Sequence, residues 1–371
     1  MLEQLKSNIQ IGATLAANRF LNMRRPLSVQ ILVTKFCDMT CNMCFTYPID
    51  SKEKFINTVE PSFEQLEYLM DEACNIGAQV IIPFGGEPLI RKDIGEIVNG
   101  IKARKKYCIL YTNATYLKDR IDEIRATDQL VISIDGDEVN HDSIRGKGSY
   151  KKCVEGIELA LEKGFSLRIH TVLTKDTLDT LPHMVSLSKK YDVMLNYGFT
   201  DATALTRPIK DEFVPSRTQV VDFLRGLLNA KLSGVKIATP GTVIKELIRV
   251  MEVWPIEGHT LSRKEAEQFK HLKIPKCGLF TSNIYIDSDG RAYPCLPLWG
   301  EEGHGPNVYK VGLQKAWDHY NNLKCHQCAS VFTIEKGLFY NFELKHVLQF
   351  LDGFEFLQKK NKSPISVKTN I

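Results

Sequence analysis

Short apolar runs alternate with stretches of helical periodicity between residues 29 and 199, and this alternation limits the fold more than any other feature. Six runs rich in β-branched residues lie at 29–36, 79–84, 107–112, 129–134, 166–173 and 192–199. The stretches with helical spacing between them lie near 62–76, 93–104, 118–126, 149–163 and 179–190. A repeated strand–helix unit predicts a parallel sheet covered by helices. Six units are fewer than the eight that close a barrel.

Three cysteines follow the first apolar run directly. Cys37, Cys41 and Cys44 have the spacing C-x3-C-x2-C in the sequence TKFCDMTCNMC. Three thiolates on one short loop can bind three irons of a cubane cluster and leave the fourth iron without a protein ligand. A structural zinc ion usually takes four ligands, often from C-x2-C pairs, and no fourth ligand lies nearby in the sequence. The spacing therefore favours an iron–sulfur cluster with one open iron.

This loop resembles that of the radical SAM superfamily, in which the open iron chelates S-adenosylmethionine (SAM). The second run ends in FGGEPL, and this resembles the motif with which the superfamily binds the SAM amino group. The resemblance implies that Gly85, Gly86 and Glu87 contact SAM. It also implies an α/β fold of the (β/α)6 partial TIM barrel type, with its chemistry at the carboxyl ends of the strands. The implied reaction is reductive cleavage of SAM to a 5′-deoxyadenosyl radical, which abstracts a hydrogen atom from the substrate.

The ends of the later strands supply further candidates for the cofactor site. The segment SIDGDEVNHDSIRG resembles one that is common in the SPASM and twitch branch of the superfamily. The resemblance implies that Ser133 faces the SAM ribose or carboxylate, and Arg145 could pair with a carboxylate. The other strand-end residues that we expect at the cofactor site are Thr112, Asn113, Thr171 and Tyr197.

A second set of cysteines lies far along the chain. Its members are Cys277, Cys295, Cys325 and Cys328. Four thiolates suit either a closed cubane cluster or a structural zinc ion. The pair Asp289-Gly290 between two alternating runs predicts a hairpin flanked by the first two of these cysteines. The arrangement resembles the twitch domain, a shortened relative of the SPASM domain, and implies an auxiliary [4Fe–4S] cluster.

These features divide the chain into five expected parts. They are an N-terminal amphipathic helix (1–26), a radical SAM core (27–215), a helical bridge (216–275), a small α+β domain of the twitch or SPASM type (276–335), and a C-terminal helix with a polar tail (336–371). In the first part Leu2, Leu5, Ile9, Ala16 and Phe20 share one helical stripe. That stripe favours a helix over one end of the barrel, with peripheral contact to a membrane surface as the alternative.

The composition limits which kinds of partner can be expected. A formal net charge of +4 in 371 residues gives no reason to expect a nucleic-acid partner. The chain shows no signal peptide and no apolar run of about 18 residues, and its thiolates must stay reduced. We therefore expect a cytoplasmic protein. The resemblance implies a flavodoxin- or ferredoxin-type electron donor.

Three functions remain open from the sequence. A closed auxiliary cluster has no open iron, so it is better suited to accept an electron than to bind substrate, and this favours net oxidation of a small molecule in a dehydrogenase-type reaction. The first alternative is a peptide-modifying enzyme of the SPASM type, acting on a short peptide to form a cross-link or an oxidised residue. The second is a zinc-stabilised binding module without catalysis. Leu296 stands where sulfatase-maturing relatives carry an Asp as a base, so formylglycine formation is disfavoured.

Overall fold

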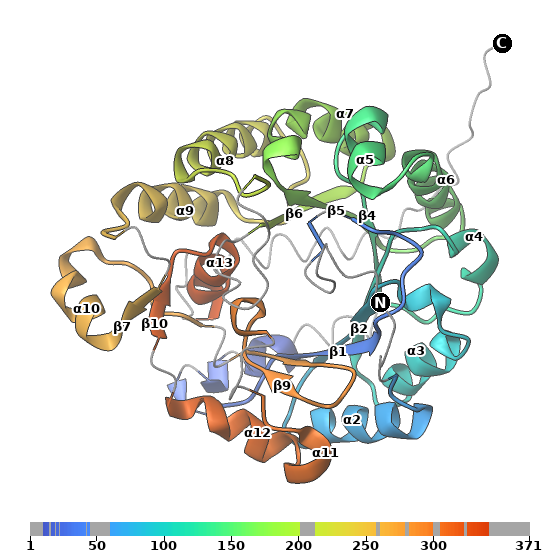
Figure 1. The fold of residues 1–371 in the computed structure, drawn as a ribbon, viewed down its shortest axis with the longest axis horizontal. Coiled ribbons are helices and arrows are strands. Elements are labelled where there is room, and N and C mark those ends of the chain that lie inside the picture. The colour runs from blue at the N-terminus through green and yellow to red at the C-terminus, as the bar shows by residue number, and fades with distance from the viewer. Residues whose placement is uncertain are drawn as a thin grey trace.

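The computed structural model describes the chain in segments. They are residues 10–14, 16–18, 20–21, 23–41, 43–44, 60–200, 212–256, 260–278, 282–299, 305–322 and 325–340. The description below refers to these residues, and Figure 1 shows the helices arranged around the strands.

All six expected strands are confirmed to within two residues at each end. They are β1 (Ser28–Thr34), β2 (Val80–Gly85), β3 (Tyr107–Thr112), β4 (Gln129–Ser133), β5 (Leu167–Leu173) and β6 (Met194–Phe199). Neighbouring strands in this series pair in parallel, in the order β6-β5-β4-β3-β2-β1. All six therefore run in the same direction and end at the same edge of the sheet.

Most of the expected helices are also confirmed. The outer layer includes α2 (Phe63–Asn75), α3 (Ile94–Ala103), α6 (Ser149–Glu162) and α7 (Leu181–Tyr191). The start of α2 is fixed because the Ser62 hydroxyl accepts from the Gln65 N–H while the Gln65 side chain accepts from the Ser62 N–H. One face of α2 is buried against the sheet through Leu66, Leu69 and Met70.

One helical prediction was wrong, and one helix was not predicted. The stretch 118–126 contains only the short helix α4 (Leu117–Arg120), followed by turns. The segment after β4, for which the sequence predicted no helix, contains helix α5 (Glu138–Arg145). The Asp137 carboxylate caps α5 by accepting from the Asn140 N–H at 3.0 Å. Polar residues on most of its surface hid this helix from an apolar pattern.

The predicted hairpin is present, but it does not stand apart from the barrel. It consists of β8 (Asn283–Ile286) and β9 (Ala292–Tyr293), with Tyr285 opposite Tyr293. Gly290 in its turn has φ +85°, a backbone conformation that favours glycine. The strand β8 pairs in parallel with β1, so the hairpin extends the barrel sheet beyond its first strand. The segment expected to be a separate small domain thus shares a sheet with the core.

Most of the remaining segments lie on the side of the barrel between β6 and β9 (Figure 1). The bridge contains α8 (Arg217–Leu232) and α9 (Gly241–Val253), as expected. The last part of the bridge, which we expected to be helical as well, instead contains strand β7 (Thr260–Ser262) before the short helix α10 (Arg263–Gln268). The strand β10 (Cys325–Cys328) pairs antiparallel with β7. The helices α11 (Val308–Val311) and α12 (Leu313–His319) precede β10 in the chain. Helix α13 (Val331–Tyr340) follows β10 and contacts α9 and β6.

The N-terminal segment lies against one end of the barrel. Ile11 is buried and packs in one cluster with Leu27 and with Tyr107 at the start of β3. This supports the barrel-covering interpretation over membrane contact, although the expected stripe is partly wrong because Phe20 is 68% exposed. Leu2, Leu5 and Ile9 lie outside the described residues, as does most of 336–371. Among the described helices, none has the length and apolar character needed to span a bilayer.

Candidate active site

The cysteine loop leaves the end of β1 at the carboxyl edge of the sheet. Cys37, Cys41 and Cys44 are all free thiols and all partly exposed. The Met39 N–H lies 3.4 Å from Cys37 Sγ, and the Cys44 N–H donates to the Cys41 carbonyl at 3.2 Å. Burial raises the pKa of Cys37 to about 12, although the hydrogen bond from the Met39 N–H acts to lower it. A bound cationic metal supplies the positive charge that a thiolate needs in such a place.

The loop presents three accessible thiols from one short segment, and this donor set fits a cubane cluster with one open iron. Among the residues described, no three His, Cys, Asp or Glu side chains already meet at metal-ligand distance. The structure therefore shows where the loop lies and which thiols it offers.

The two glycines of the GGE turn are required by packing against the cysteine loop. A Cβ on Gly85 would lie 2.3 Å from the Thr34 carbonyl oxygen, and one on Gly86 would lie 2.3 Å from the Phe36 carbonyl oxygen. The Gly86 N–H donates to the Thr34 carbonyl at 2.9 Å, and the Glu87 N–H donates to the Phe36 carbonyl at 2.8 Å. The turn and the start of the cysteine loop are thus one packed unit, a role that the sequence motif alone did not reveal.

Glu87 joins the ends of β2 and β3. Its carboxylate is 1% exposed and accepts from the Leu89 N–H at 3.0 Å, the Thr112 hydroxyl at 2.9 Å and the Asn113 N–H at 2.7 Å. Burial raises the pKa of Glu87 to about 7, and these donors act in the opposite direction. Each carboxylate oxygen can accept two hydrogen bonds, so Oε2 retains capacity for one more donor. The contact between Glu87 and the SAM amino group remains a prediction.

We expect Glu87→Gln to destabilise the fold. The amide nitrogen of Gln donates and cannot accept, so one of the three donors around position 87 would lose its acceptor inside the protein. A buried donor without a partner costs about 1–3 kcal/mol, measurable as a lower free energy of unfolding in urea. The control is Glu123→Gln on the surface, where loss of the Arg120 ion pair should cost less than about 1 kcal/mol. Equal effects of the two variants would contradict this role of Glu87.

Asn113 ties the cysteine loop to the third strand. Its Nδ2 donates to Asp38 Oδ1 at 2.9 Å and lies 3.9 Å from Cys37 Sγ. Its Oδ1 accepts from the Thr115 N–H at 2.9 Å. The structure therefore brings Thr112 and Asn113 to the predicted site, Thr112 through Glu87 and Asn113 through the loop. Asp38 is a site residue that the sequence analysis missed, although it lies within the cysteine motif.

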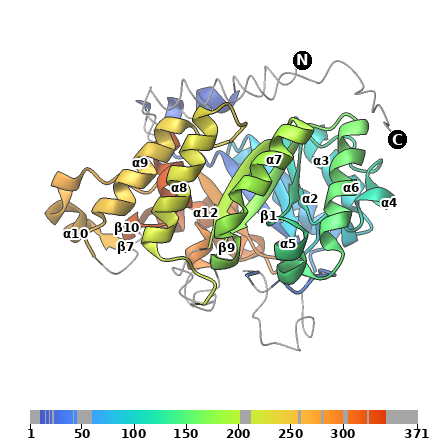
Figure 2. The same cartoon turned by 90° about the horizontal axis from the view of Figure 1, so that it is seen from above.

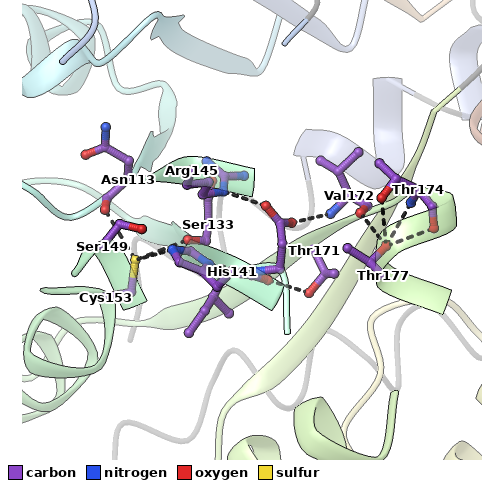
Figure 3. Close-up of polar contacts among 12 residues, drawn as sticks. Asn113, Ser133, His141, Arg145, Ser149, Cys153, Thr171, Val172, Thr174 and Thr177 are labelled. Carbon is purple, nitrogen blue, oxygen red and sulfur yellow. Dashed lines mark hydrogen bonds and ion pairs between the residues drawn. The ribbon is translucent and has the colours of Figure 1, made fainter. Parts of the chain in front are cut away.

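A buried ion pair lies at the end of β4 (Figure 3). Asp135 is fully buried, its Oδ1 accepts from the Val172 N–H at 2.9 Å, and its Oδ2 pairs with Arg145 Nε from α5. Burial opposes the charge of Arg145, but Asp135 outweighs it and raises the pKa of the guanidinium. The positive charge of Arg145 also acts on the Cys41 thiol, whose pKa burial raises and Arg145 lowers. The charge of Arg145 thus reaches the cysteine loop, and the carboxylate with which it pairs is Asp135 of the same chain.

His141 and Cys153 complete this network beneath Ser133, and the sequence analysis missed both roles (Figure 3). The Asp135 N–H donates to His141 Nδ1 at 3.0 Å, and Cys153 Sγ lies 3.7 Å from His141 Nε2. The same thiol is 3.4 Å from the Ser133 carbonyl oxygen and 3.3 Å from that of Asn113. The thiol therefore links the ends of β3 and β4. Ser133 itself lies at the predicted edge and is partly exposed.

Two predicted cofactor residues do not face the site. The Thr171 hydroxyl is buried and donates to the Ile134 carbonyl at 2.7 Å. The Tyr197 ring packs 5.1 Å from the Phe223 ring of α8, on the outer face of the sheet. Side chains alternate between the two faces of a strand, so a position assigned one residue off lies on the wrong face. The neighbours His170 and Asn196 face inward instead, with Asn196 Nδ2 2.9 Å from His170 Nδ1.

Three of the four later cysteines lie on neighbouring backbone. The Cys277 N–H donates to the His326 carbonyl at 3.1 Å, so Cys277 adjoins the strand that carries Cys325 and Cys328. Cys295 is buried at the end of β9. The side chain of Cys325 lies outside the described residues. A common centre for all four thiols stays a prediction.

A groove of about 960 Å³ opens beside this cysteine segment. Its lining includes the basic side chains of Arg263, Lys264, Lys270 and Lys276. Among the described residues that line it, one carboxylate is present, that of Glu267, which pairs with Lys270 at 2.6 Å. The groove therefore presents net positive charge.

The parallel partial barrel, with a three-cysteine loop and a GGE turn packed together at its carboxyl edge, defines a class of iron–sulfur enzymes that use SAM. Residues 31–187 match the family model described as the radical SAM superfamily, which identifies this part of the chain as a radical SAM domain. The match supports a [4Fe–4S] cluster and SAM as its cofactors, with Cys37, Cys41 and Cys44 as the residues that would hold the cluster.

Relatives of known name support this assignment. The chain is 28% identical over 295 residues to an AdoMet-dependent heme synthase of Methanosarcina barkeri, covering 77% of this chain and 80% of that protein. It is 26% identical over 223 residues to a GTP 3′,8-cyclase of Helicobacter pylori, covering 57% of this chain and 68% of the cyclase. The match to a heme synthase of Nitratidesulfovibrio vulgaris spans only 43% of either protein.

Solved structures confirm the fold. The structure of Streptococcus suis SuiB bound to its precursor peptide SuiA superposes with a TM-score of 0.61 at 16% identity, over 82% of this chain and 68% of SuiB. The structure of anSMEcpe with bound AdoMet gives 0.61 at 14% identity, over 90% of this chain and 98% of anSMEcpe.

Proposed function

We propose that this enzyme carries out a SAM-dependent radical oxidation of a small molecule, with the second cysteine set holding an auxiliary [4Fe–4S] cluster. When bound, the first cluster and SAM supply a radical that abstracts a hydrogen atom from the substrate. The observation that carries the proposal is the meeting of the cysteine loop, the GGE turn and the Asp135–Arg145 pair at one edge of the barrel.

The residues of this edge act by positioning. The Gly86 backbone and the contact between Asn113 and Asp38 hold the cysteine loop against β2 and β3. Asp135 fixes the Arg145 guanidinium through Nε, which leaves its other N–H groups to bind a carboxylate such as that of SAM. Fixed donors of this kind cost no reorganisation during reaction.

The auxiliary cluster gives the substrate electron a destination. Cys277 lies beside the strand of Cys325 and Cys328, and Cys295 follows the hairpin that extends the barrel sheet. A closed cluster at this place would accept an electron from a substrate radical, which turns hydrogen abstraction into net oxidation. A zinc ion held by the same thiols would stabilise the segment without this role.

The names of the relatives favour a small molecule. Heme synthase and GTP cyclase act, by their names, on small molecules, and the chain aligns with the first over most of its length. A short peptide is the second candidate. SuiB binds a precursor peptide, but the likeness to it is one of fold.

Product analysis tests this function directly. The reconstituted enzyme, SAM and a reductant would be incubated with a host-cell extract separated into small metabolites and peptides. We expect a product two mass units lighter than its substrate in the metabolite fraction, with one 5′-deoxyadenosine formed for each product molecule. A product of unchanged mass would contradict oxidation, and a product found only in the peptide fraction would establish the peptide alternative.

We further propose that the basic groove beside Cys277 receives an acidic flavodoxin- or ferredoxin-type electron donor. Complementary charge raises association rates about 10- to 1,000-fold. Charge reversal by Arg263→Glu with Lys264→Glu should therefore slow flavodoxin-driven SAM cleavage about tenfold or more. Cleavage driven by dithionite should not change. Lys118→Glu on α4, across the barrel from α10 (Figure 1), is the control. Equal slowing with both reductants would contradict docking at this groove.

A further inference from the structure

Several side chains on the inward face of the barrel strands are partly exposed to solvent. Along β5 the outward residues are buried, whereas Arg168, His170 and Val172 between them are partly exposed. The inward positions Tyr111 on β3 and Asn196 on β6 are partly exposed as well. In a closed eight-stranded barrel such positions fill the interior. Here they lie on the inward face of the sheet, on strands that Figure 1 shows around the centre of the barrel.

Arg168 brings a charge into the lumen of the barrel without an ion-pair partner. Its Nε is buried and has no hydrogen-bond partner. No carboxylate of the described residues lies within ion-pair distance of its guanidinium. Burial lowers the pKa of Arg168, and the groups that oppose this are Tyr107, Tyr111 and Glu335. A guanidinium in such a place is costly unless an anion pairs with it.

Apart from Glu335, the neighbours of Arg168 are polar but neutral. Burial lowers the pKa of His170 to about 4, although the Asp135 carboxylate acts to raise it. The imidazole is therefore uncharged at neutral pH. The Asn196 amide bonds to its Nδ1 at 2.9 Å, and the Tyr111 ring meets it edge to face at 5.7 Å. The Glu335 carboxylate on α13 accepts from the Thr239 hydroxyl at 2.7 Å. One fixed positive charge, with the Glu335 carboxylate within electrostatic reach of it, matches a monoanion better than a dianion.

We infer that Arg168 binds a carboxylate group of the substrate inside the barrel lumen, beneath the SAM site. The inference rests on the proposed function, because it takes the lumen as the substrate cavity. The strand from Arg168 to Val172, whose N–H reaches Asp135 at the mouth, rises about 13 Å. A substrate held by this carboxylate would therefore place its reacting carbon up to about 13 Å away. An elongated monocarboxylic acid fits this site.

Binding of aromatic probes tests the site without radical chemistry. The full-length reconstituted protein would be titrated calorimetrically, without reductant, with 4-bromobenzoate, 4-bromobenzamide and 4-bromophenylphosphonate. We expect the benzoate to bind at least tenfold more tightly than the amide. Arg168→Gln should remove that preference, and Glu335→Gln should increase it, because a repelling carboxylate is lost. The control Arg225→Gln changes an exposed guanidinium on α8 and should bind like the wild type.

Co-crystal structures and thermal unfolding complete the test. The anomalous signal of bromine in co-crystals should lie in the lumen beside Arg168. Without probe, Arg168→Gln should unfold at the same or a higher temperature than the wild type, because an unpaired buried charge is removed. Equal binding of benzoate and amide, undiminished preference in Arg168→Gln, or tighter binding of the phosphonate would overturn the inference. Since no reductant is present, this result is independent of whether the enzyme cleaves SAM.

Discussion

Changing Cys37, Cys41 and Cys44 together to Ala should abolish reductive cleavage of SAM. Anaerobically reconstituted wild type, supplied with SAM and dithionite, should release 5′-deoxyadenosine, and the triple variant should release none above the protein-free background. The physical reason is that three thiolates on one loop are the protein's ligands for a cubane cluster with an open iron. The measurement is chromatography of the nucleoside with mass detection.

The variant should still fold, which makes this test informative. All three thiols are partly exposed. The loop is held by backbone hydrogen bonds to the GGE turn and by the contact between Asp38 and Asn113, and these contacts do not involve a cysteine side chain. The control Cys74→Ala removes a partly exposed thiol on α2 and should leave cleavage unchanged. SAM cleavage by the triple variant at the wild-type rate would refute the cluster assignment.

The strands and the edge of the sheet where they end could be predicted from the sequence because parallel strands covered by helices need nearly continuous apolar runs. The cysteine loop could be placed because its spacing is short and local. The helix α5 could not, since its cap and polar surface carry no apolar stripe. The pairing of β8 with β1 was also beyond the sequence, because a contact between residues 28 and 283 leaves no local signal.

The inward and outward faces of β5 and β6 show a subtler limit. Thr171 and Tyr197 were chosen for the site, and the structure turns both away from it. Their neighbours His170 and Asn196 face the lumen instead. These strands carry apolar and polar residues on both faces, so the period of two could be read in either register. The arginine at position 168, on the same inward face, was missed for this reason.

The roles of Gly86 and Glu87 were predicted for a different reason from the one that the structure shows. The motif suggested contacts with SAM, whereas the observed contacts join the second strand to the cysteine loop and to β3. Both roles are compatible, because a turn that must present a ligand site needs rigid support. A sequence motif identifies the residues, but only tertiary contacts show which of them support the site.

The second set of cysteines decides between oxidation and a structural metal. If Cys277, Cys295, Cys325 and Cys328 hold a [4Fe–4S] cluster, the reconstituted wild type should contain about eight irons per chain and negligible zinc. The triple variant of the first loop should then contain about four irons. Elemental analysis of both proteins gives the answer. Stoichiometric zinc with four irons in the wild type would show that the centre is structural, and the support for net oxidation would be lost.

Activity assays separate the electron-accepting role of this centre from a structural role. Because β10 pairs with β7 through backbone hydrogen bonds, Cys325→Ala with Cys328→Ala should leave the strand in place. We expect this variant to cleave SAM while product formation falls at least tenfold, since the substrate electron has no acceptor. Loss of all soluble protein would instead show that metal binding at this centre is coupled to folding of the segment. Because Cys277 adjoins the same strand, Cys277→Ala should have the same effect as the double variant.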